Sequence, residues 1–407
     1  MTSAEGIQVR AATESDWPAI ELLDAVGFGY HPAEPDRTLG RALNRIDDIV
    51  VATDDGNPVG VALHLPLELT VPGGHRAATR GVSWVSVAPT HRRRGVLRAM
   101  FTHLHREIAA TGVPLSALTA SEGGIYGRFG YGPATVVSDV TLDRRFARFR
   151  DDAPDPGGVQ VVDATTAARH LPEIYDRWRR ITPGAQARPE PHWEFTFTDP
   201  ESGRGGGTGL FFLLHPDGYA MFRRRGDGDA RTAVVEELIA VTDDAHAALW
   251  RALCGLDLMV RVEASTHPDD SLRHMLTDPR LVRTPRVVDA LWLRILDPPA
   301  ALEARTYALD LDTVVEVRDP YLDAGGTYAL TVRDGHAQCR RTDASPTISL
   351  DLEVLGSLYL GGHHARPFAA AGRVRAMSDR ELTQFDLAFR AERDTVTWEE
   401  LGTHPLV

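Results

Sequence analysis

The segment that most constrains the fold of this chain of 407 residues lies at residues 85–98 and reads VSVAPTHRRRGVLR. An alternating apolar strand ends at Pro89, and an apolar helix begins just after Gly95, with three arginines between them. Cations at a helix N-terminus are unfavourable by about 0.3–1 kcal/mol each, because the helix dipole is positive there. The arginines are best explained by an anion that docks on the free N–H groups of the helix, where Gly95 permits close approach. A pyrophosphate is the best candidate.

The order of these elements indicates more than a basic collar before a surface helix, which is the plain alternative. Strand, proline, arginines, glycine and apolar helix follow one another without interruption. This order resembles the acyl-CoA signature of the GNAT N-acetyltransferases. In that family the splayed strand end, here residues 85–87, pairs with the pantetheine amide, and the loop and helix start hold the pyrophosphate.

Composition and charge narrow the class of protein. Hydrophobic residues make up 43% of the chain and charged residues 25%, which is ordinary for a globular protein. At about 150 residues per domain, the length predicts two or three domains. The net charge of −13 argues against nucleic acid as the main partner and is compatible with cationic substrates.

Cysteine and histidine patterns predict that the protein holds no metal. Cys254 and Cys339 are too few for a disulfide framework or a cysteine metal site. His103 and His105 stand two apart on a predicted helix and therefore do not share a face. Residues 190–194 alternate like a strand, but no ligand completes a metal site there.

The chain carries no signal for a membrane or for export. Its first ten residues have no apolar run suited to a signal peptide, and no apolar stretch reaches 18 residues. We therefore expect a soluble, cytoplasmic protein without a membrane partner.

The hydrophobic pattern predicts an α/β (α+β) protein of three domains. Strand and helix signals alternate in residues 1–150, and we predict a mixed-sheet domain that ends at the turn-rich linker near residue 150. A second domain is predicted at residues 151–297 and a third at residues 298–407. The third has alternating strands followed by short helices, and it resembles the small α/β module of sterol carrier proteins.

The predicted second domain repeats part of the first. Residues 237–253 read as strand, loop and helix, and aligned without gaps on the first domain they place Ala252 on Ala99. Asp243 and Asp244 would repel a phosphate, and no arginine-rich loop remains. We interpret this unit as a degenerate copy that keeps the packing and has lost the cofactor. Chance similarity between two αβ units is the alternative.

Acetyl transfer from a thioester to an amine requires a bound donor, a base for the ammonium and an acid for the thiolate. An alkylammonium of pKa about 10.4 loses its proton at pH 7 only at a cost of about 4–5 kcal/mol, so a nearby base or a depressed pKa of the amine is needed. Tyr126 stands where the acid is expected, after the predicted strand at residues 115–119 and among glycines. Tyr131 competes for this role, and position alone leaves both open. Ser121 and Glu122 open the following helix as N-cap-like residues, with N–H groups available to the cofactor.

Two segments closely resemble the Eis family of bacterial N-acetyltransferases: ASEGGIYGRFGYGPAT at residues 120–135 and VAPTHRRRGVLRAM at residues 87–100. Shorter supporting motifs lie at residues 215–220, 249–253, 266–268, 291–294 and 355–361. The resemblance implies an active GNAT domain, a degenerate central GNAT-like domain and a sterol-carrier-like third domain. It also implies a homohexamer built as a trimer of dimers.

The resemblance also assigns roles to single residues. Tyr126 becomes the general acid, and the terminal α-carboxylate, here on Val407, becomes the general base. Burial would raise the pKa of this carboxylate above its usual value of about 3.3–3.7. The family's amine pocket is lined with acids and aromatics, and here we expect Phe28, Trp84 and Asp289 to line it. The residues assigned to acetyl-CoA are Val85, Ser86, Val87, Arg93, Arg94, Gly95, Val96, Leu97, Arg98, Ser121 and Glu122.

The function predicted on this basis is transfer of the acetyl group of acetyl-CoA to a small-molecule amine. The expected acceptors are primary amines of aminoglycosides or similar polyamine or lysine-type compounds. The alternative is a non-catalytic CoA- or lipid-sensing scaffold on a GNAT fold, which CoA would stabilise without release of thiol. The arginine loop and Tyr126 favour the enzyme.

Overall fold

The computed structural model describes residues 6–29, 31, 34–322, 324–393 and 395 of the chain. The chain divides into two compact units, one containing the segment up to Thr135 together with Ala290–Glu392, the other Val136–Asp289. Three sheets of seven, seven and five strands form the framework, and helices cover them, which confirms the expected α/β class. Within the described ranges, none of the helices is both long enough and apolar enough to cross a membrane.

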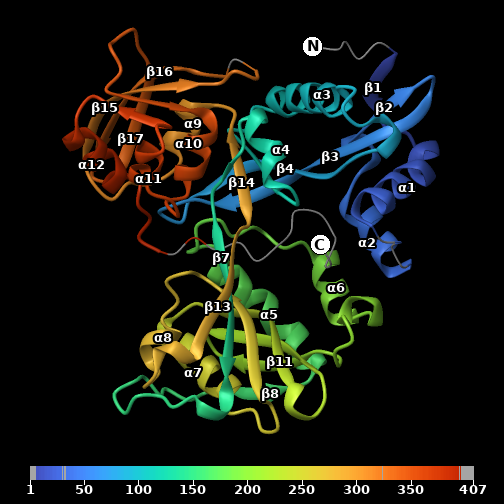
Figure 1. Ribbon diagram of the computed structural model, residues 1–407, viewed down its shortest axis with the longest axis vertical. Coiled ribbons are helices and arrows are strands. Elements are labelled where there is room, and N and C mark those ends of the chain that lie inside the picture. Colours follow the sequence, from blue (N-terminus) through green and yellow to red (C-terminus); the bar gives the residue numbers. More distant parts are fainter. Residues whose placement is uncertain (1–5, 30, 32–33, 323, 394, 396–407) are drawn as a thin grey trace. The chain divides into compact units, whose positions relative to one another are not determined.

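A seven-stranded sheet forms the centre of the first unit (Figure 1). In the order of the sheet its strands are β1 (Ile7–Ala11), β2 (Ile49–Asp54), β3 (Asn57–Thr70), β4 (Arg76–Val87), β5 (Leu115–Thr119), β14 (Leu291–Ile295) and β6 (Gly132–Pro133). The accompanying helices are α1 (Trp17–Phe28), α2 (Glu34–Leu43), α3 (Val96–Ala110) and the short α4 (Gly123–Tyr126).

The two faces of this sheet follow from the alternation of side chains along β3. Val61 and Leu63 are buried in one cluster with Ile20 of α1. Ala62, between them, is buried in another cluster with Phe101 of α3. Successive side chains of a strand point to opposite faces, so α1 and α3 cover opposite faces of the sheet.

Strands β4 and β5 diverge after a short parallel ladder. Only Thr79–Gly81 of β4 pairs with Leu115–Ala117 of β5, whereas β4 stays paired with β3 as far as Val87. Trp84 and Val85 lie together opposite a single residue of β3, and Trp84 has a φ of 52°. Such a bulge bends a strand and redirects its side chains. The second half of β4 therefore presents an edge that β5 does not pair with.

The two seven-stranded sheets exchange one strand each, so that each contains a strand that is adjacent in the sequence to a strand of the other sheet. Strand β7 (Val136–Asp143) directly follows β6, but it pairs with β12 and β13 of the second sheet. Strand β14 directly follows β13, but it pairs with β5 and β6 of the first sheet. The sequence-based boundaries at residues 150 and 297 assign both strands differently, because the turn-rich linker marks a loop and not the point where the sheets separate.

The second unit repeats the order of the first. Its sheet runs β13-β7-β12-β11-β10-β9-β8, and β11 and β12 form a short parallel ladder before and after helix α7, as β4 and β5 do around α3. Thr242 caps α7, and Asp243 and Asp244 occupy its first turn, where acids complement the helix dipole. The new strands are β8 (Gln160–Val162), β9 (Phe211–His215), β10 (Gly218–Arg225), β11 (Thr232–Ala240), β12 (Arg261–Thr266) and β13 (Val282–Asp289). The helices are α5 (Ala164–Arg179), α6 (Glu190–Thr198), α7 (Asp243–Cys254) and α8 (Leu272–Met275).

Residues 190–194, expected to alternate as a strand, form instead the first half of helix α6. Pro191 lies in the first turn, where a missing N–H is tolerated. Trp193 is buried, stacks on Phe197 at 5.8 Å and meets Tyr175 edge-on at 5.6 Å. The spacing of Trp193 and Phe197 places both rings on one helix face, so aromatic packing decides the conformation here.

A five-stranded sheet with the order β17-β16-β15-β18-β19 completes the first unit. Helix α10 of this third domain packs on β6 and β14, because Gly132 and Gly356 bring the backbones together. A Cβ on Gly132 would lie 1.9 Å from the carbonyl oxygen of Glu353, and one on Gly356 would lie 2.2 Å from that of Leu293. The strands are β15 (Leu311–Arg318), β16 (Gly326–Arg333), β17 (His336–Arg341), β18 (Ile348–Asp351) and β19 (Val374–Ala376). The helices are α9 (Pro298–Glu303), α10 (Leu352–Tyr359), α11 (Ala365–Ala370) and α12 (Asp379–Ala388).

Candidate active site

In the connection from β4 to α3, backbone N–H groups have no partner among the residues that the structure describes. Arg93 and Gly95 adopt positive φ angles of 64° and 83°, and this conformation is uncommon for a residue with a side chain. The N–H of Ala99 bonds to the carbonyl of Gly95 at 3.0 Å, so the N–H groups of residues 96–98 lie outside the helical ladder. A helix start of this kind suits an anion.

The arginines beside this helix start have different surroundings. Arg94 donates to a carboxylate oxygen of Asp54 at 3.1 Å, and His91 Nε2 lies 3.1 Å from the same oxygen. Arg92 and Arg93 are exposed to solvent. An acid of β2 therefore offsets part of the charge of Arg94, and the exposed pair extends the positive charge of the loop.

Two aromatic rings lie close to Arg98, in the first turn of α3. Its guanidinium carbon is 5.9 Å from the ring centroid of Phe129 and 5.8 Å from that of Tyr321. Both distances fit cation–π contacts. A surface groove of about 390 Å³ runs along the same face of the helix and is lined by Val9, Gly95, Arg98, Ala99, Thr102, His103 and Arg106.

At the end of β4, the backbone is available to a ligand, whereas the polar side chain of Ser86 is not. Ser86 is buried, and its hydroxyl donates to the carbonyl of Leu23 in α1 at 2.8 Å. Val85 and Val87 are half-buried in the part of β4 beyond its ladder with β5. Because a strand directs its N–H and C=O groups alternately to its two edges, half of these groups face away from β3.

Tyr126 follows β5 at the end where that strand diverges from β4. Its side chain is only 6% exposed, and its ring stacks on Phe101 of α3 at 6.0 Å. Burial, with a smaller contribution from the charge of Glu122, raises the pKa of Tyr126 to about 12. Among the residues that the structure describes, nothing forms a hydrogen bond with the Tyr126 hydroxyl.

Tyr131, the competing tyrosine, has a fully engaged hydroxyl. It lies 2.7 Å from Ser116 Oγ and 2.8 Å from His105 Nε2. His105 Nδ1 is 2.8 Å from the carbonyl of Phe101 and must donate to it, so Nε2 accepts the proton of the Tyr131 hydroxyl. Burial lowers the pKa of His105 to about 3, which keeps the ring neutral. Of the two tyrosines, Tyr126 has the available hydroxyl.

Ser121 and Glu122 are both exposed at the start of α4. The N-cap position belongs to Glu122, and Ser121 lies one residue before it. The cap has no side-chain hydrogen bond of its own. No capping side chain therefore occupies the N–H groups at the start of this helix.

The residues expected to line an amine pocket lie on different elements. Trp84 is buried in the β4 bulge and meets Trp17 of α1 edge-on at 6.2 Å. Phe28 is the half-buried last residue of α1. Asp289 is the exposed last residue of β13 and belongs to the second unit. Val407, the expected base, lies outside the described residues.

The histidines of α3 have separate surroundings. His103 lies 3.2 Å from Glu107 on the partly exposed side of the helix, whereas His105 is fully buried. Over the described ranges, we find no group of three or more side chains arranged to hold a metal ion.

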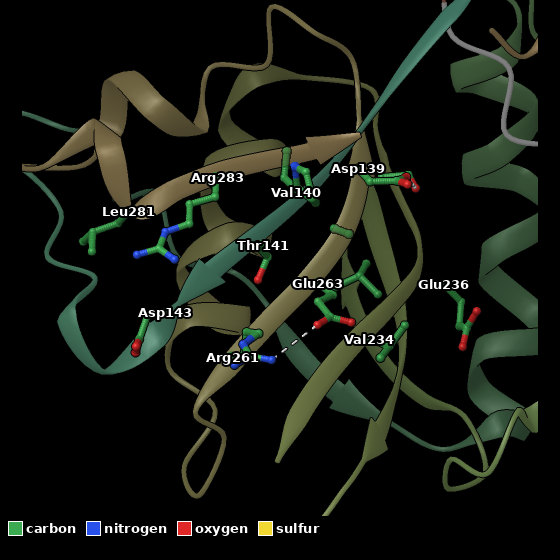
Figure 2. Close-up of a pocket in the computed structure, with 14 residues that line it drawn as sticks. Asp139, Val140, Thr141, Asp143, Val234, Glu236, Arg261, Glu263, Leu281 and Arg283 are labelled. Carbon is green, nitrogen blue, oxygen red and sulfur yellow. Dashed lines mark hydrogen bonds and ion pairs between the residues drawn. The ribbon is translucent and has the colours of Figure 1, made fainter. Parts of the chain in front are cut away.

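A hollow of about 670 Å³ lies on the second unit, over β7, β11, β12 and β13 (Figure 2). Its acids already have cationic neighbours, since Asp139 accepts from Arg286 at 2.7 Å and Glu236 lies 3.0 Å from Arg223. None of the site residues expected from the sequence lines it. A sheet with one solvated face has this polar character, so we do not assign the hollow to the active site.

Three family models cover most of the chain. Residues 8–134 match the acetyltransferase (GNAT) domain, and so do residues 184–295. Residues 298–398 match the sterol carrier protein domain. The expected fold of two GNAT units and a sterol-carrier-like domain is therefore confirmed.

The proteins named N-acetyltransferase Eis from Mycobacterium tuberculosis and Mycobacterium bovis are 49% identical to this chain over 391 residues, which cover 93% of it and 96% of the relatives. The chain belongs to the Eis family of N-acetyltransferases. An uncharacterized N-acetyltransferase of Streptomyces coelicolor is 35% identical over 96% of this chain and 98% of its own length. The crystal structure of Eis1 from Mycobacterium abscessus matches with a TM-score of 0.86 at 32% identity, covering 97% of this chain and 100% of that one.

Membership in the Eis family makes the chain an acyltransferase and argues against the predicted alternative of a non-catalytic scaffold. Acetyl-CoA is the donor that GNAT acetyltransferases use. Sequence reasoning missed three residues near the helix start: Asp54, Arg294 and Tyr321. Arg294 left one signal, a single charge inside the apolar strand Leu291–Ile295. Tyr321 left none, because only the fold brings it to α3.

Proposed function

We propose that this chain transfers the acetyl group of acetyl-CoA to primary amines of aminoglycosides or of similar polyamine or lysine-type acceptors. The unpaired edge of β4 after Gly81 suits the amide groups of the pantetheine arm. The free N–H groups at the start of α3 suit the diphosphate, with the positive charge of Arg93, Arg94 and Arg98 beside them. Ser121 and Glu122, which follow β5, are proposed to contact the donor through their backbone N–H groups.

The observation that carries this proposal is the Tyr126 hydroxyl beside the divergence of β4 and β5, which has no hydrogen-bond partner among the described residues. A raised pKa keeps the phenol protonated throughout the neutral range, so it remains a donor for the sulfur of the departing CoA thiolate. Stacking on Phe101 fixes the ring relative to α3. Tyr131 packs edge-on against the ring of Tyr126, and it does not supply the proton.

We propose the C-terminal carboxylate of Val407 as the base that takes the ammonium proton, directly or through a water. Phe28 and Trp84 are proposed as apolar walls of the acceptor pocket, and Asp289 as its acid. The net charge of −13 favours the approach of a polycationic acceptor. We further propose the homohexamer, a trimer of dimers, that resemblance to the family implies.

The variant Tyr126→Phe tests the acid. It removes only the hydroxyl, so release of CoA thiol at saturating acetyl-CoA and amine should fall about 100-fold or more, the usual effect of losing a general acid. Calorimetry with CoA should give a Kd within about twofold of wild type, because the diphosphate site is unchanged.

Tyr131→Phe is the matched control, since it removes the same atom from a neighbouring tyrosine. Its folded fraction should keep most of the wild-type turnover. If Tyr126→Phe keeps its turnover, or if Tyr131→Phe loses as much, the assignment of the acid is wrong. If the wild-type chain binds no CoA, the whole proposed function is wrong.

A further inference from the structure

A loop of the third domain, which begins at Asp319 after β15, is fixed to the first sheet by a buried ion pair. The carboxylate of Asp319 accepts from the N–H groups of Tyr321 and Ala324, both at 3.1 Å, which shapes the loop. Arg294 of β14 pairs with this carboxylate at 2.5 Å, and neither side chain is exposed. Arg294 also donates to the carbonyl of Phe129 at 2.7 Å, in the turn that follows Tyr126.

This loop places the ring of Tyr321 against the first turns of α3. The ring meets Phe129 edge-on at 5.0 Å and His105 edge-on at 5.6 Å. Its hydroxyl lies 3.4 Å from Thr102 Oγ, and its centroid lies 5.8 Å from the guanidinium carbon of Arg98. An aromatic side chain of the third domain thus forms one wall around an arginine of the first domain.

The position of Arg98 matters because an exposed arginine samples many rotamers, and ordering it on an anion costs conformational entropy. The ring centroids of Phe129 and Tyr321 lie 5.9 Å and 5.8 Å from the guanidinium carbon, and each ring offers a cation–π contact. These contacts restrict the rotamers of the side chain. Phe129 belongs to the first domain, so Tyr321 is the contribution of the third.

We propose that Tyr321 is a positioning residue for Arg98, and that the third domain thereby completes the site for the diphosphate of the acetyl donor. The inference rests on the proposed function for the identity of that ligand. Tyr321 acts through Arg98 and does not itself touch the donor. A sterol-carrier-like domain then has a role in donor binding that needs no lipid.

A double-mutant cycle on the full-length chain, read by calorimetry with CoA, tests this coupling. Tyr321→Ala should raise the Kd about two- to fivefold, the effect of losing one cation–π contact. The KM for acetyl-CoA should rise in parallel while kcat stays within about twofold, because the lost interaction concerns binding only. In an Arg98→Ala background, Tyr321→Ala should have no further effect, since the partner is gone.

Two further variants separate positioning from simple loss of structure. Tyr321→Phe keeps the ring and should bind CoA like wild type, whereas Tyr321→Leu keeps the apolar bulk without an aromatic face and should lose as much as Tyr321→Ala. Leu309→Ala changes a 45% exposed side chain of the same domain and should leave the Kd unchanged. An unchanged Kd in Tyr321→Leu, or additive losses in the cycle, would overturn the inference while the proposed function stands. A wild-type chain that binds no CoA would overturn both.

Discussion

At the scale of single residues, Tyr126 and Tyr131 show how the surroundings of a side chain determine the role of its hydroxyl group. Both rings are buried, and burial raises the pKa of both phenols. Tyr131 is fully buried, with its hydroxyl between Ser116 and His105. Tyr126 has no such partner among the described residues, which leaves its proton for a ligand. The same chemical group is structural at one position and available for chemistry at the other.

Tyr131→Phe should destabilise the protein by about 1–3 kcal/mol, because His105 Nε2 loses its buried hydrogen-bond donor. Tyr126→Phe should change the stability little, since the hydroxyl forms no hydrogen bond with the residues that the structure describes. Thermal unfolding followed by circular dichroism compares the two variants with wild type. Equal shifts of Tm in the two variants would contradict the assignment of the two hydroxyls.

At the scale of elements, the sequence predicted the helices and strands that local hydrophobic patterns and turn residues specify. The strand at Leu115–Thr119 and the helix that begins just after Gly95 lie where the pattern indicated. In the turn before β3, Asp55 and Gly56 adopt left-handed conformations. Strand β17 was missed because its residues HAQCRR have no apolar alternation, although the preceding Asp334-Gly335 turn is a hairpin signal. No local pattern in the sequence indicates the exchange of β7 and β14, because it is defined only by the pairing of strands that are far apart in the chain.

The contact of α10 with β14 depends on a missing side chain. Gly356→Ala would place a Cβ 2.2 Å from the carbonyl oxygen of Leu293, and backbone on both sides resists movement. We expect a loss of stability of about 1–3 kcal/mol, typical of overpacking. Gly124→Ala, on the helical turn α4, is the matched control, because its Cβ meets nothing within 4 Å. Chemical denaturation of the two variants measures the difference, and similar midpoints would refute the backbone contact.

At the scale of the whole molecule, the ion pair of Arg294 and Asp319 joins the third domain to the first sheet. Burial opposes ionisation of Asp319, but the hydrogen bond and charge of Arg294, with N–H groups of the loop, hold the pKa of this carboxyl below its usual value. A depressed pKa in the folded state means that the unfolded chain binds the proton more readily. The pair therefore contributes stability above about pH 4, the unfolded value, and this contribution is lost as the pH falls towards the folded pKa.

Asp319→Asn should lower stability at pH 7 by about 3–5 kcal/mol, because Arg294 then stays buried without its counter-ion. The gap to wild type should narrow as the pH falls below about 4, since protonation removes the same charge from the native chain. Asp312→Asn breaks the surface pair with Arg333 and should cost less than about 1 kcal/mol. Thermal unfolding between acid and neutral pH compares the three proteins, and a gap that does not depend on pH would contradict the role of this pair.

The exchange of β7 and β14 sets the order in which the chain can fold as it leaves the ribosome. Strand β14 lies between β5 and β6, so the first sheet stays incomplete until residue 295 has been synthesised. Strand β7 is made early and has no partner until β12 and β13 emerge. A nascent chain must therefore keep the first sheet open until residue 295 of 407 has been made. A fragment cut at residue 150 would leave edges of β5 and β7 unpaired and prone to aggregation.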